Sequence, residues 1–329
     1  MFQGGNLDLR LDDAVPLAAA LTFHECRRLN IAALLLKGTP ASDIGVRPPK
    51  VPGDVDVLLE RTDAQRLMEA LQGRGWLERP VTHEGDHPIH SITLYHPRWP
   101  CDIDIHFAFP GMDDDPRSAF RALWECRRET ALAGQPVNAL DITGSTLIQA
   151  LHALREIHKE SNRRELAFLL EDARRPRWSD LQPLASATQS LGALRPYIAQ
   201  GFPEVNTAAL PDPSHRWLLR AGISAPGVHR MLFLKNLPWR QRPAYVWRAL
   251  IPSREMLASL DITLLEADQA ALWTARRRRL KRFVASGASV FRQWLKFRPQ
   301  TRNQRQHAFD EGTQNTPPLP DENAAGRRD

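Results

Sequence analysis

The first part of the chain alternates between short apolar runs and segments rich in glycine, proline and charged residues. Six apolar residues in a row, at 31–36, are typical of a buried strand. Segments 54–59 and 101–107 have aspartates at alternate positions near their starts, separated by branched apolar residues. Apolar residues recur at helical spacing over 14–30 and 62–73. The pattern predicts short strands that alternate with helices.

A helical pattern replaces the strand pattern after about residue 141. Ser145 is a candidate cap for a helix over 146–160, and a second helix follows up to Pro176. Proline-interrupted helical pieces come next, and the composition near the end is polar and typical of disorder. The predicted units are an α/β core at 1–140, a mostly helical C-terminal domain at 141–265, a basic amphipathic helix at 266–299 and a disordered tail at 300–329.

Composition places the chain among globular proteins and excludes several other classes. Apolar residues make up 42% and charged residues 25% of the 329 positions, as in ordinary folded domains. The sequence contains no run of about 18 apolar residues, so we expect no membrane span. The three cysteines lack the spacing of a zinc site or of a disulfide framework. We therefore expect a cytoplasmic protein.

Net charge indicates the kind of partner. The chain has a formal charge of +6 and a sequence pI near 9.6, which favours anionic partners. A cluster of arginines begins the amphipathic helix, and apolar residues recur there at helical spacing. Such a helix binds nucleic acid or lies peripherally on an anionic membrane surface, or it packs its apolar stripe on its own domain with the arginines in water. The predicted partner-binding residues are Arg276, Arg277, Arg278, Arg279, Lys281 and Arg282.

Two acidic strands carry the candidate chemistry. Side chains two positions apart in a strand share a face, so Asp54 and Asp56 point to the same side. Two carboxylates on one face repel each other unless a cation or a proton lies between them, and Mg²⁺ or Mn²⁺ takes oxygen ligands of this kind. The alternative is a strand end with two solvated aspartates. In the later strand, Asp102, Asp104 and His106 share one face.

A group of histidines lies between the two acidic strands. His83, His87, His90 and His96 are irregularly spaced around Pro88, and no cysteine lies among them. Zinc sites use more regular spacings of histidine and cysteine. A loop with solvated histidines is therefore the preferred interpretation over a metal site.

The order of these features along the chain resembles a known superfamily. A glycine follows the first strand in Leu36-Lys37-Gly38, an acidic pair begins the second in Gly53-Asp54-Val55-Asp56, and the third contains Asp104-Ile105-His106. The set resembles the nucleotidyltransferase superfamily of DNA polymerase beta. More narrowly, with Arg47 before the acidic pair, the chain resembles an uncharacterised bacterial nucleotidyltransferase family up to about residue 265.

The resemblance implies an α+β fold class, in which a small mixed β-sheet with flanking helices forms a nucleotidyltransferase core with three catalytic acids. Asp54 and Asp56 would hold the metal ion that carries the triphosphate, and Asp104 would complete the site for a second ion. The substrate would be an NTP such as ATP, and Mg²⁺ or Mn²⁺ would assist transfer of its NMP to an unknown hydroxyl acceptor. Backbone N–H groups of the glycine turn and nearby positive charges would bind the phosphates. The candidate nucleotide-binding residues are Lys37, Gly38, Thr39 and Arg47.

Several assignments stay open on the sequence. Thr39 stands where the superfamily has Gly or Ser, and prolines lengthen the gap before Asp54. Asp102 shares a face with Asp104 and is an alternative ligand. His106 is a general base, an acceptor-site residue or a hydrogen-bonded structural histidine. The alternative function is a non-catalytic accessory or binding protein of the same fold in a polysaccharide or modified-peptide biosynthetic pathway.

Overall fold

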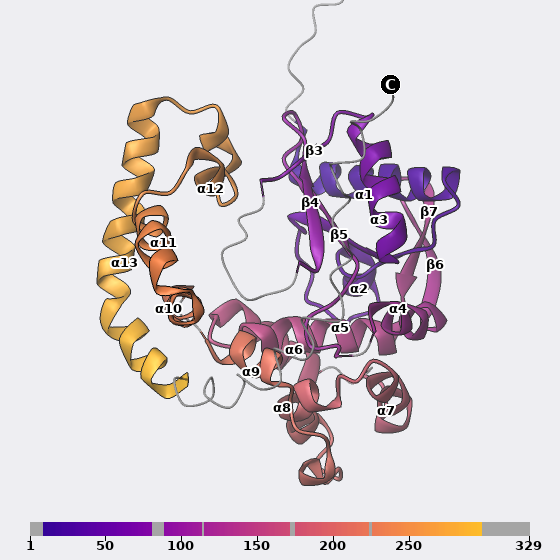
Figure 1. Ribbon diagram of the computed structural model, residues 1–329. Helices are drawn as coiled ribbons and strands as arrows, with labels where there is room; N and C mark the ends of the chain where they lie inside the picture. The colour runs from indigo at the N-terminus through magenta and orange to yellow at the C-terminus, as the bar shows by residue number, and fades with distance from the viewer. Residues whose placement is uncertain (1–8, 81–88, 114, 172–174, 224–225, 298–329) are drawn as a thin grey trace, which may run out of the picture.

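A mixed sheet, with seven strands among the described residues, forms the centre of the N-terminal part (Figure 1). Its strand order is β3-β4-β5-β2-β1-β7-β6. The central strands β2 and β5 run parallel, while β1 pairs antiparallel with β2 and parallel with β7. The computed structural model describes residues 9–80, 89–113, 115–171, 175–223 and 226–297. The strands are β1 Ala33–Leu35, β2 Asp54–Leu59, β3 Leu77–Glu78, β4 Ser91–Tyr95, β5 Asp102–His106, β6 Arg127–Leu132 and β7 Gln135–Leu140.

Helices flank the sheet and make up most of the chain after it. Helix α1 precedes β1, α3 connects β2 to β3, and α5 to α13 follow β7. The helices are α1 Leu11–Arg28, α2 Thr39–Asp43, α3 Arg61–Gln72, α4 Pro116–Glu125, α5 Ile142–Arg155, α6 Glu160–Glu171, α7 Trp178–Ala187, α8 Leu191–Gly201, α9 His215–Gly222, α10 Pro226–Asn236, α11 Arg242–Leu250, α12 Arg254–Ala258 and α13 Gln269–Phe297.

The two faces of the sheet pack against different helices. Val57 of β2 belongs to a core that the sheet shares with α1 and α3. Its neighbour Leu58 belongs to a second core, which the sheet shares with α5 to α8. Because side chains alternate along a strand, Asp56 points to the same face as Leu58. The acidic strands therefore present their carboxylates toward the helical region.

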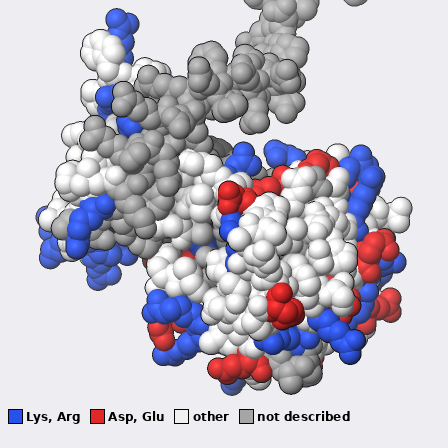
Figure 2. All heavy atoms as spheres, turned by 90° about the horizontal axis from the view of Figure 1, so that it is seen from below, with Lys and Arg blue, Asp and Glu red and all other residues white. Residues whose placement is uncertain are grey.

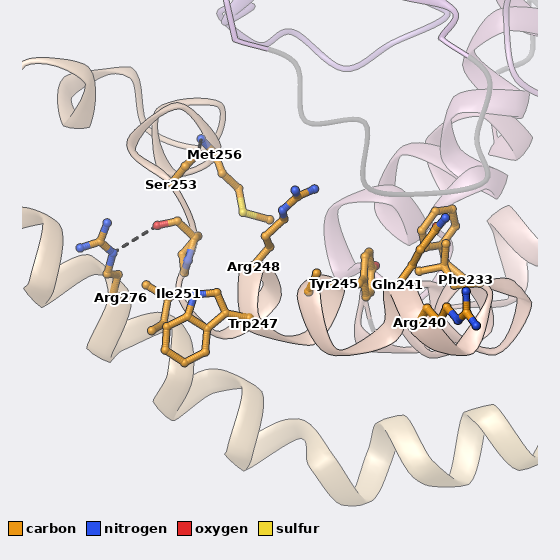
Figure 3. Close-up of a pocket in the computed structure, with 13 residues that line it drawn as sticks. Phe233, Arg240, Gln241, Tyr245, Trp247, Arg248, Ile251, Ser253, Met256 and Arg276 are labelled. Atoms are coloured by element: carbon orange, nitrogen blue, oxygen red, sulfur yellow. Dashed lines mark hydrogen bonds between the residues drawn. The ribbon is translucent and has the colours of Figure 1, made fainter.

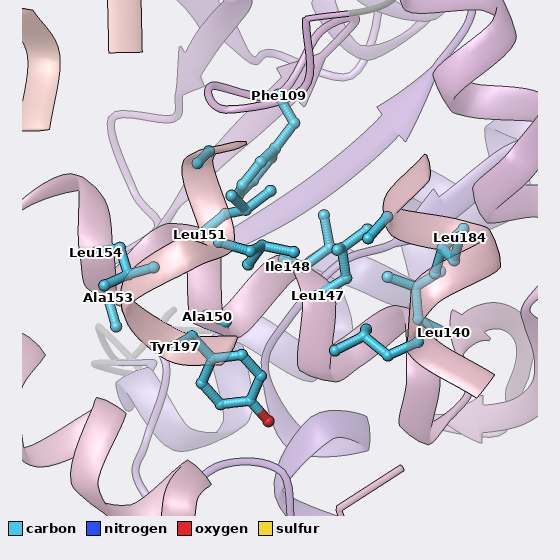
Figure 4. Packing of buried hydrophobic residues seen from close by; sticks show 14 of the residues in the cluster. Phe109, Leu140, Leu147, Ile148, Ala150, Leu151, Ala153, Leu154, Leu184 and Tyr197 are labelled. Carbon is cyan, nitrogen blue, oxygen red and sulfur yellow. The ribbon is translucent and has the colours of Figure 1, made fainter. Parts of the chain in front are cut away.

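Helix α5 is buried over most of its length against that face. Every residue from Gly144 to Leu151 is buried, and Leu147 and Ile148 have no exposed surface. Their side chains lie in one core with residues of the sheet and of α6 to α8 (Figure 4). A helix that is apolar on all sides belongs in the interior of a protein. The sheet and the helices that follow it therefore depend on a common core.

The last helices have a small core of their own. Val290 of α13 packs against Val228 of α10 and against Ile223. Gly227 is needed for this approach, because an added Cβ would lie 2.9 Å from a Val290 methyl group. In Figure 1, α13 lies along α10 and α11 at the left of the molecule. The predicted amphipathic helix thus packs one edge on the protein, while side chains such as Val284 stay 71% exposed.

The predicted α+β fold class, a mixed sheet with flanking helices and a mostly helical C-terminal region, is confirmed. The hairpin of β6 and β7 was not predicted. It turns at Ala133 and Gly134, whose φ angles of 47° and 76° lie in the left-handed region. The predicted cap at Ser145 was wrong, since α5 begins at Ile142. The Asp141 side chain caps it by accepting a hydrogen bond from the Gly144 N–H at 2.8 Å.

The described residues also bear on the predictions about a membrane span and about the histidines. Among the described helices, none combines the length and apolar character needed to cross a membrane. His90 contacts Arg220, and the ring centroids of His96 and Trp76 are 5.5 Å apart, so these histidines are not simply solvated. His83, His87 and the tail predicted at 300–329 lie outside the described residues.

The burial of α5 predicts how two leucines differ in their effect on stability. We expect Leu147→Ala to lower the free energy of unfolding by about 2–5 kcal/mol, because the substitution leaves a cavity in the shared core. Leu280→Ala on α13 is the control, since Leu280 is 45% exposed; its effect should stay below about 0.5 kcal/mol. Urea unfolding followed by circular dichroism measures both, and equal losses would contradict the placement of α5.

Candidate functional site

The parallel pairing of β2 and β5 brings the predicted acidic residues together. Asp56 is in register with Asp104, and Asp54 with Asp102. His106 follows Asp104 by two positions on β5 and shares its face. Ligand atoms of Asp56, Asp104 and His106 all lie within 4.8 Å of one another. Within the described ranges, these three side chains form a group that can hold a metal ion, which we call the acidic group.

Asp56 is a buried carboxylate with two partners. It is 5% exposed, and its Oδ1 accepts a hydrogen bond from Lys37 Nζ at 2.9 Å and lies 3.0 Å from His106 Nε2. Burial alone opposes ionisation of Asp56. The positive charge of Lys37 and the His106 hydrogen bond outweigh it and hold the pKa of Asp56 well below its usual range. Asp56 is therefore an anion at neutral pH.

Asp104 offers an oxygen that nothing else in the described structure uses. Its Oδ1 is buried and has no hydrogen-bond partner among the described residues. A buried carboxylate oxygen without a partner is costly, and a bound cation is one way to satisfy it. Hard divalent ions take carboxylate oxygens as ligands. The donor set and this oxygen therefore fit a divalent metal ion.

Asp102, the alternative ligand, has a different partner. Arg79, which follows β3, forms an ion pair with the Asp102 carboxylate. Arg79 thereby compensates the charge of Asp102, and Asp102 is not part of the acidic group. Of the two acids on this face of β5, Asp104 is the one presented to Asp56.

Asp54 lies at the open start of β2. The residue is exposed, and its carboxylate is not among the three donors that lie within 4.8 Å of one another. Partial burial of the carboxyl group and the negative charge of Asp56 raise the pKa of Asp54 to about 6. The two acids are therefore close enough to repel each other, as their spacing in the sequence predicts.

The predicted glycine turn leaves open space beside Lys37. Gly38 has a φ of +83°, a conformation that favours glycine, and Thr39 begins the short helix α2 directly after it. A Cβ added at Gly38 would meet nothing within 4 Å. The turn therefore leaves room for a ligand group to approach the backbone next to the Lys37–Asp56 pair.

Arg47 is held by a residue that sequence reasoning missed. Its Nη2 lies 3.7 Å from Glu165 Oε1 on α6, and its Nε has no partner among the described residues. Glu165 is 8% exposed and also accepts a hydrogen bond from Gln149 Nε2 of α5 at 2.8 Å. Lys50 Nζ lies 3.8 Å from Glu165 Oε1. Helices α5 and α6 thus position the predicted phosphate-binding arginine.

His152 of α5 is a second residue that was not predicted. Its Nε2 lies 4.0 Å from Glu165 Oε2, and its Nδ1 is buried without a partner among the described residues. Burial, together with the charges of Lys37 and Arg155, lowers the pKa of His152 to about 2. His152 is therefore a neutral imidazole in the working pH range. The available signal was a polar pair, Gln149 and His152, three positions apart in the otherwise apolar stretch 147–154.

The predicted basic residues of α13 differ in their surroundings. Arg276 Nε donates a hydrogen bond to the Pro252 carbonyl at 3.2 Å, and its guanidinium lies over the Trp273 ring. Arg277, Arg278, Lys281 and Arg282 are exposed. On the face seen in Figure 2, Lys and Arg gather over the C-terminal helices at the left, whereas both signs of charge mix elsewhere.

A large cavity lies away from the acidic group. It has a volume of about 930 Å³ and lies among α10, α11 and α12, where aromatic and arginine side chains line it (Figure 3). Arg276 is the only residue of those predicted for nucleotide, metal or partner binding that lines it. Size alone therefore does not mark the candidate site, which depends on donor chemistry.

Comparisons with known proteins find remote structural neighbours. Neither a protein-family model nor a curated protein matches the chain. An antigenic nucleotidyltransferase-like protein from Paracoccidioides brasiliensis is 14% identical, with a TM-score of 0.36 over 57% of this chain and 92% of that one. The lincosamide adenylyltransferase LnuA, with lincomycin bound, is 14% identical, with a TM-score of 0.31 over 47% and 95%. A tRNA nucleotidyltransferase with primer tRNA and an ATP analogue is 12% identical, with a TM-score of 0.24 over 89% and 99%.

Two of these structural neighbours are nucleotidyltransferases, and the third is described as nucleotidyltransferase-like. The likenesses are too slight to identify a reaction, which depends on the residues of the acidic group itself. The narrower bacterial family stays a prediction, because no family model matches.

The unpartnered oxygen of Asp104 predicts an opposite effect of one substitution with and without metal. We expect Asp104→Asn to leave the melting temperature unchanged or higher in the presence of a chelator, because it removes negative charge from a carboxylate whose buried Oδ1 has no partner among the described residues. The same variant should lose the rise in melting temperature that Mn²⁺ gives the wild type. Differential scanning fluorimetry measures both effects. Asp102→Asn is the control and should keep the Mn²⁺ response; an Asp104→Asn variant that also keeps it would contradict the metal assignment.

Proposed function

We propose that the chain is a metal-dependent nucleotidyltransferase, which moves an NMP from an NTP such as ATP to a hydroxyl acceptor. The observation that carries the proposal is the acidic group, in which Asp56 and Asp104 face each other across parallel strands beside Lys37. The open space over Gly38 lies next to the same lysine. A divalent ion and a triphosphate would thus meet at one end of the sheet.

Three acids share the binding of metal in this proposal. Asp56 and Asp104 would hold Mg²⁺ or Mn²⁺, with Asp54 at the open start of β2 as the further ligand nearest the solvent. A divalent ion bound there supplies charge for the developing negative oxygens and lowers the pKa of the acceptor hydroxyl. His106 orients Asp56, because its Nε2 and Lys37 Nζ lie on the same carboxylate oxygen.

Positive charge and backbone groups would bind the nucleotide. Once a divalent ion takes its place on Asp56, the Lys37 ammonium can direct its N–H donors at phosphate oxygens over the Gly38 turn. Backbone N–H groups at Gly38 and Thr39 would cradle the phosphates. Arg47, held by Glu165, adds a fixed positive charge. As the acceptor oxygen bonds to the α-phosphorus and pyrophosphate leaves, these groups stabilise the charge on the phosphates.

One observation favours the alternative, a non-catalytic accessory protein of a polysaccharide or modified-peptide pathway. Lys37 Nζ, at 2.9 Å from Asp56 Oδ1, already places a cation on the acid that would bind metal. A lysine in this place can replace the metal ion as the counter-charge, and the fold would then bind a nucleotide or partner without turnover. The two functions differ in whether a divalent ion displaces Lys37 from Asp56.

Turnover separates the two functions. The assay contains NTPs labelled at the α-phosphorus, Mg²⁺ or Mn²⁺, and fractions of a small-molecule extract as acceptors. We expect the wild type to release pyrophosphate and to label one acceptor fraction. Asp104→Asn should lower the rate about 100-fold or more, because it removes stabilisation of the transferring phosphate. Asp102→Asn is the matched control and should stay within a few-fold. Nucleotide binding by calorimetry without pyrophosphate release would support the accessory protein instead.

We further propose an anionic partner, nucleic acid or an anionic membrane surface, for the exposed basic residues of α13. Helix α13 contains no acidic residue, and its exposed apolar side chains include Phe283 and Phe291, at 46% and 54% exposure. Positive charge beside exposed aromatic rings suits both kinds of partner.

The two partners of α13 predict different binding profiles. A labelled oligonucleotide and vesicles with anionic lipid are the probes, and binding by either should fall steeply as salt rises. A fourfold variant should lose most of the binding; in it, Gln replaces Arg277, Arg278, Lys281 and Arg282. The control is Arg10→Gln, which is distant in the sequence and should keep the binding. Salt-independent binding, or binding that survives the fourfold variant, would rule out this role.

A further inference from the structure

A small cavity lies at the end of β5, the strand that carries His106. Its volume is about 70 Å³, well below the ~300 Å³ at which a pocket encloses a whole small molecule. The cavity therefore suits one small group of a larger ligand. Side chains that matter for its chemistry come from the residue before β4, from the segment after β5 and from α9, and they are His90, Phe109, Met112, Asp113, Arg216 and Arg220.

Ring contacts connect this cavity to the acidic group. The His106 ring, whose Nε2 is 3.0 Å from Asp56 Oδ1, has its centroid 6.0 Å from that of His90 and 6.2 Å from that of Phe109. Both of these residues line the cavity. Arg220 Nη2 lies 3.5 Å from His90 Nε2. The cavity and the acidic group are thus neighbours, with His106 between them.

Positive charge exceeds negative charge at the cavity wall. Arg216 and Arg220 both line it, and Asp113 is the acid there. The Asp113 carboxylate accepts a hydrogen bond from the Ser214 hydroxyl at 3.0 Å rather than from either arginine. Among the described residues, Arg220 makes no ion pair, and its hydrogen-bond contact is the long one to His90.

The charged residues near Arg220 at the end of α5 do not neutralise the positive charge of its guanidinium. Burial and the charge of Arg155, at the end of α5, lower the pKa of Arg220 to about 10, so Arg220 stays protonated at neutral pH. Glu156 acts in the opposite direction, but its carboxylate pairs with Lys159 Nζ at 2.6 Å. A half-buried guanidinium without a carboxylate partner favours an anionic ligand.

We propose that the acceptor of nucleotidyl transfer carries an oxyanion group, a phosphate or a carboxylate, which Arg220 binds in this cavity. A guanidinium presents forked N–H donors that match both groups. With the anion held there, the rest of the acceptor extends past His106 toward the acidic group. The same charges disfavour a cationic acceptor. This reading of the acceptor rests on the proposed function, whereas the anion site itself depends only on the cavity.

The methyl group of Met112 reports directly on the cavity. The chain has five methionines, so methyl-labelled methionine gives few NMR signals, and Met112→Leu assigns the signal of interest. Inorganic phosphate and, separately, acetate are titrated into the full chain at constant ionic strength with chloride. We expect the Met112 signal to shift and saturate with phosphate, acetate or both, and the stronger of the two identifies the preferred group.

Two arginine variants test which side chain binds the anion. Arg220→Gln should raise the anion concentration that half-saturates the Met112 shift about tenfold or more. Arg216→Gln, at an exposed position, should raise it several-fold. Arg240→Gln, on the exposed surface of the C-terminal helices, is the matched control and should leave it unchanged. Circular dichroism verifies that each variant is folded. Two results would overturn the proposal. One is a Met112 signal that does not shift in the wild type, and the other is a folded Arg220→Gln variant, alone or together with Arg216→Gln, that saturates at the same anion concentration as the wild type.

The anion site and the reaction fail in distinguishable ways. Binding of an NTP with Mn²⁺, measured by calorimetry, should be the same in wild type and Arg220→Gln, because Arg220 is not placed at the nucleotide. If the wild type binds no nucleotide but Met112 responds to anions, the proposed reaction fails and the anion site stands. If nucleotide binding and turnover are found and Met112 stays silent, the acceptor inference fails alone.

Discussion

A buried carboxylate, Asp56, sets the main constraint on this structure. A carboxylate removed from water costs several kcal/mol unless cations or hydrogen bonds compensate it. Lys37 and His106 provide that compensation on one oxygen, at 2.9 and 3.0 Å. The requirement connects three parts of the chain: the segment after β1, the middle of β2 and the end of β5. The partners of Asp56 therefore fix both the local geometry of the sheet and the place where a ligand cation can act.

The helices after the sheet complete the environment of this carboxylate. Helix α5 is apolar enough to be buried against the sheet, yet it places Gln149 and His152 at its polar positions. Through Glu165 of α6, the same helices hold Arg47 near the acids. The core and the candidate site are thus built by the same packing, because α5 cannot bury its leucines without bringing these polar groups to the sheet.

Much of this arrangement follows from alternation within strands. The aspartates at every second position predicted two acidic faces, and parallel pairing placed Asp56 beside Asp104. Strand alternation alone could not decide between Asp104, which the resemblance favoured, and Asp102, because that choice depends on Arg79, which the segment after β3 brings to Asp102. The hairpin of β6 and β7 was missed because its turn uses Ala133 rather than the usual Asn or Asp before glycine. A tertiary contact, which local patterns do not encode, accounts for the first of these gaps, and an unusual turn residue accounts for the second.

We propose that the acidic group binds a divalent ion, which takes the place of Lys37 on Asp56. A crystal structure of the chain with Mn²⁺ and a non-hydrolysable ATP analogue, with anomalous scattering from manganese, tests it most directly. We expect an anomalous peak between the Asp56 and Asp104 carboxylates, with Lys37 turned onto the phosphates. A structure with nucleotide bound, no manganese peak at these acids and Lys37 still on Asp56 would contradict it.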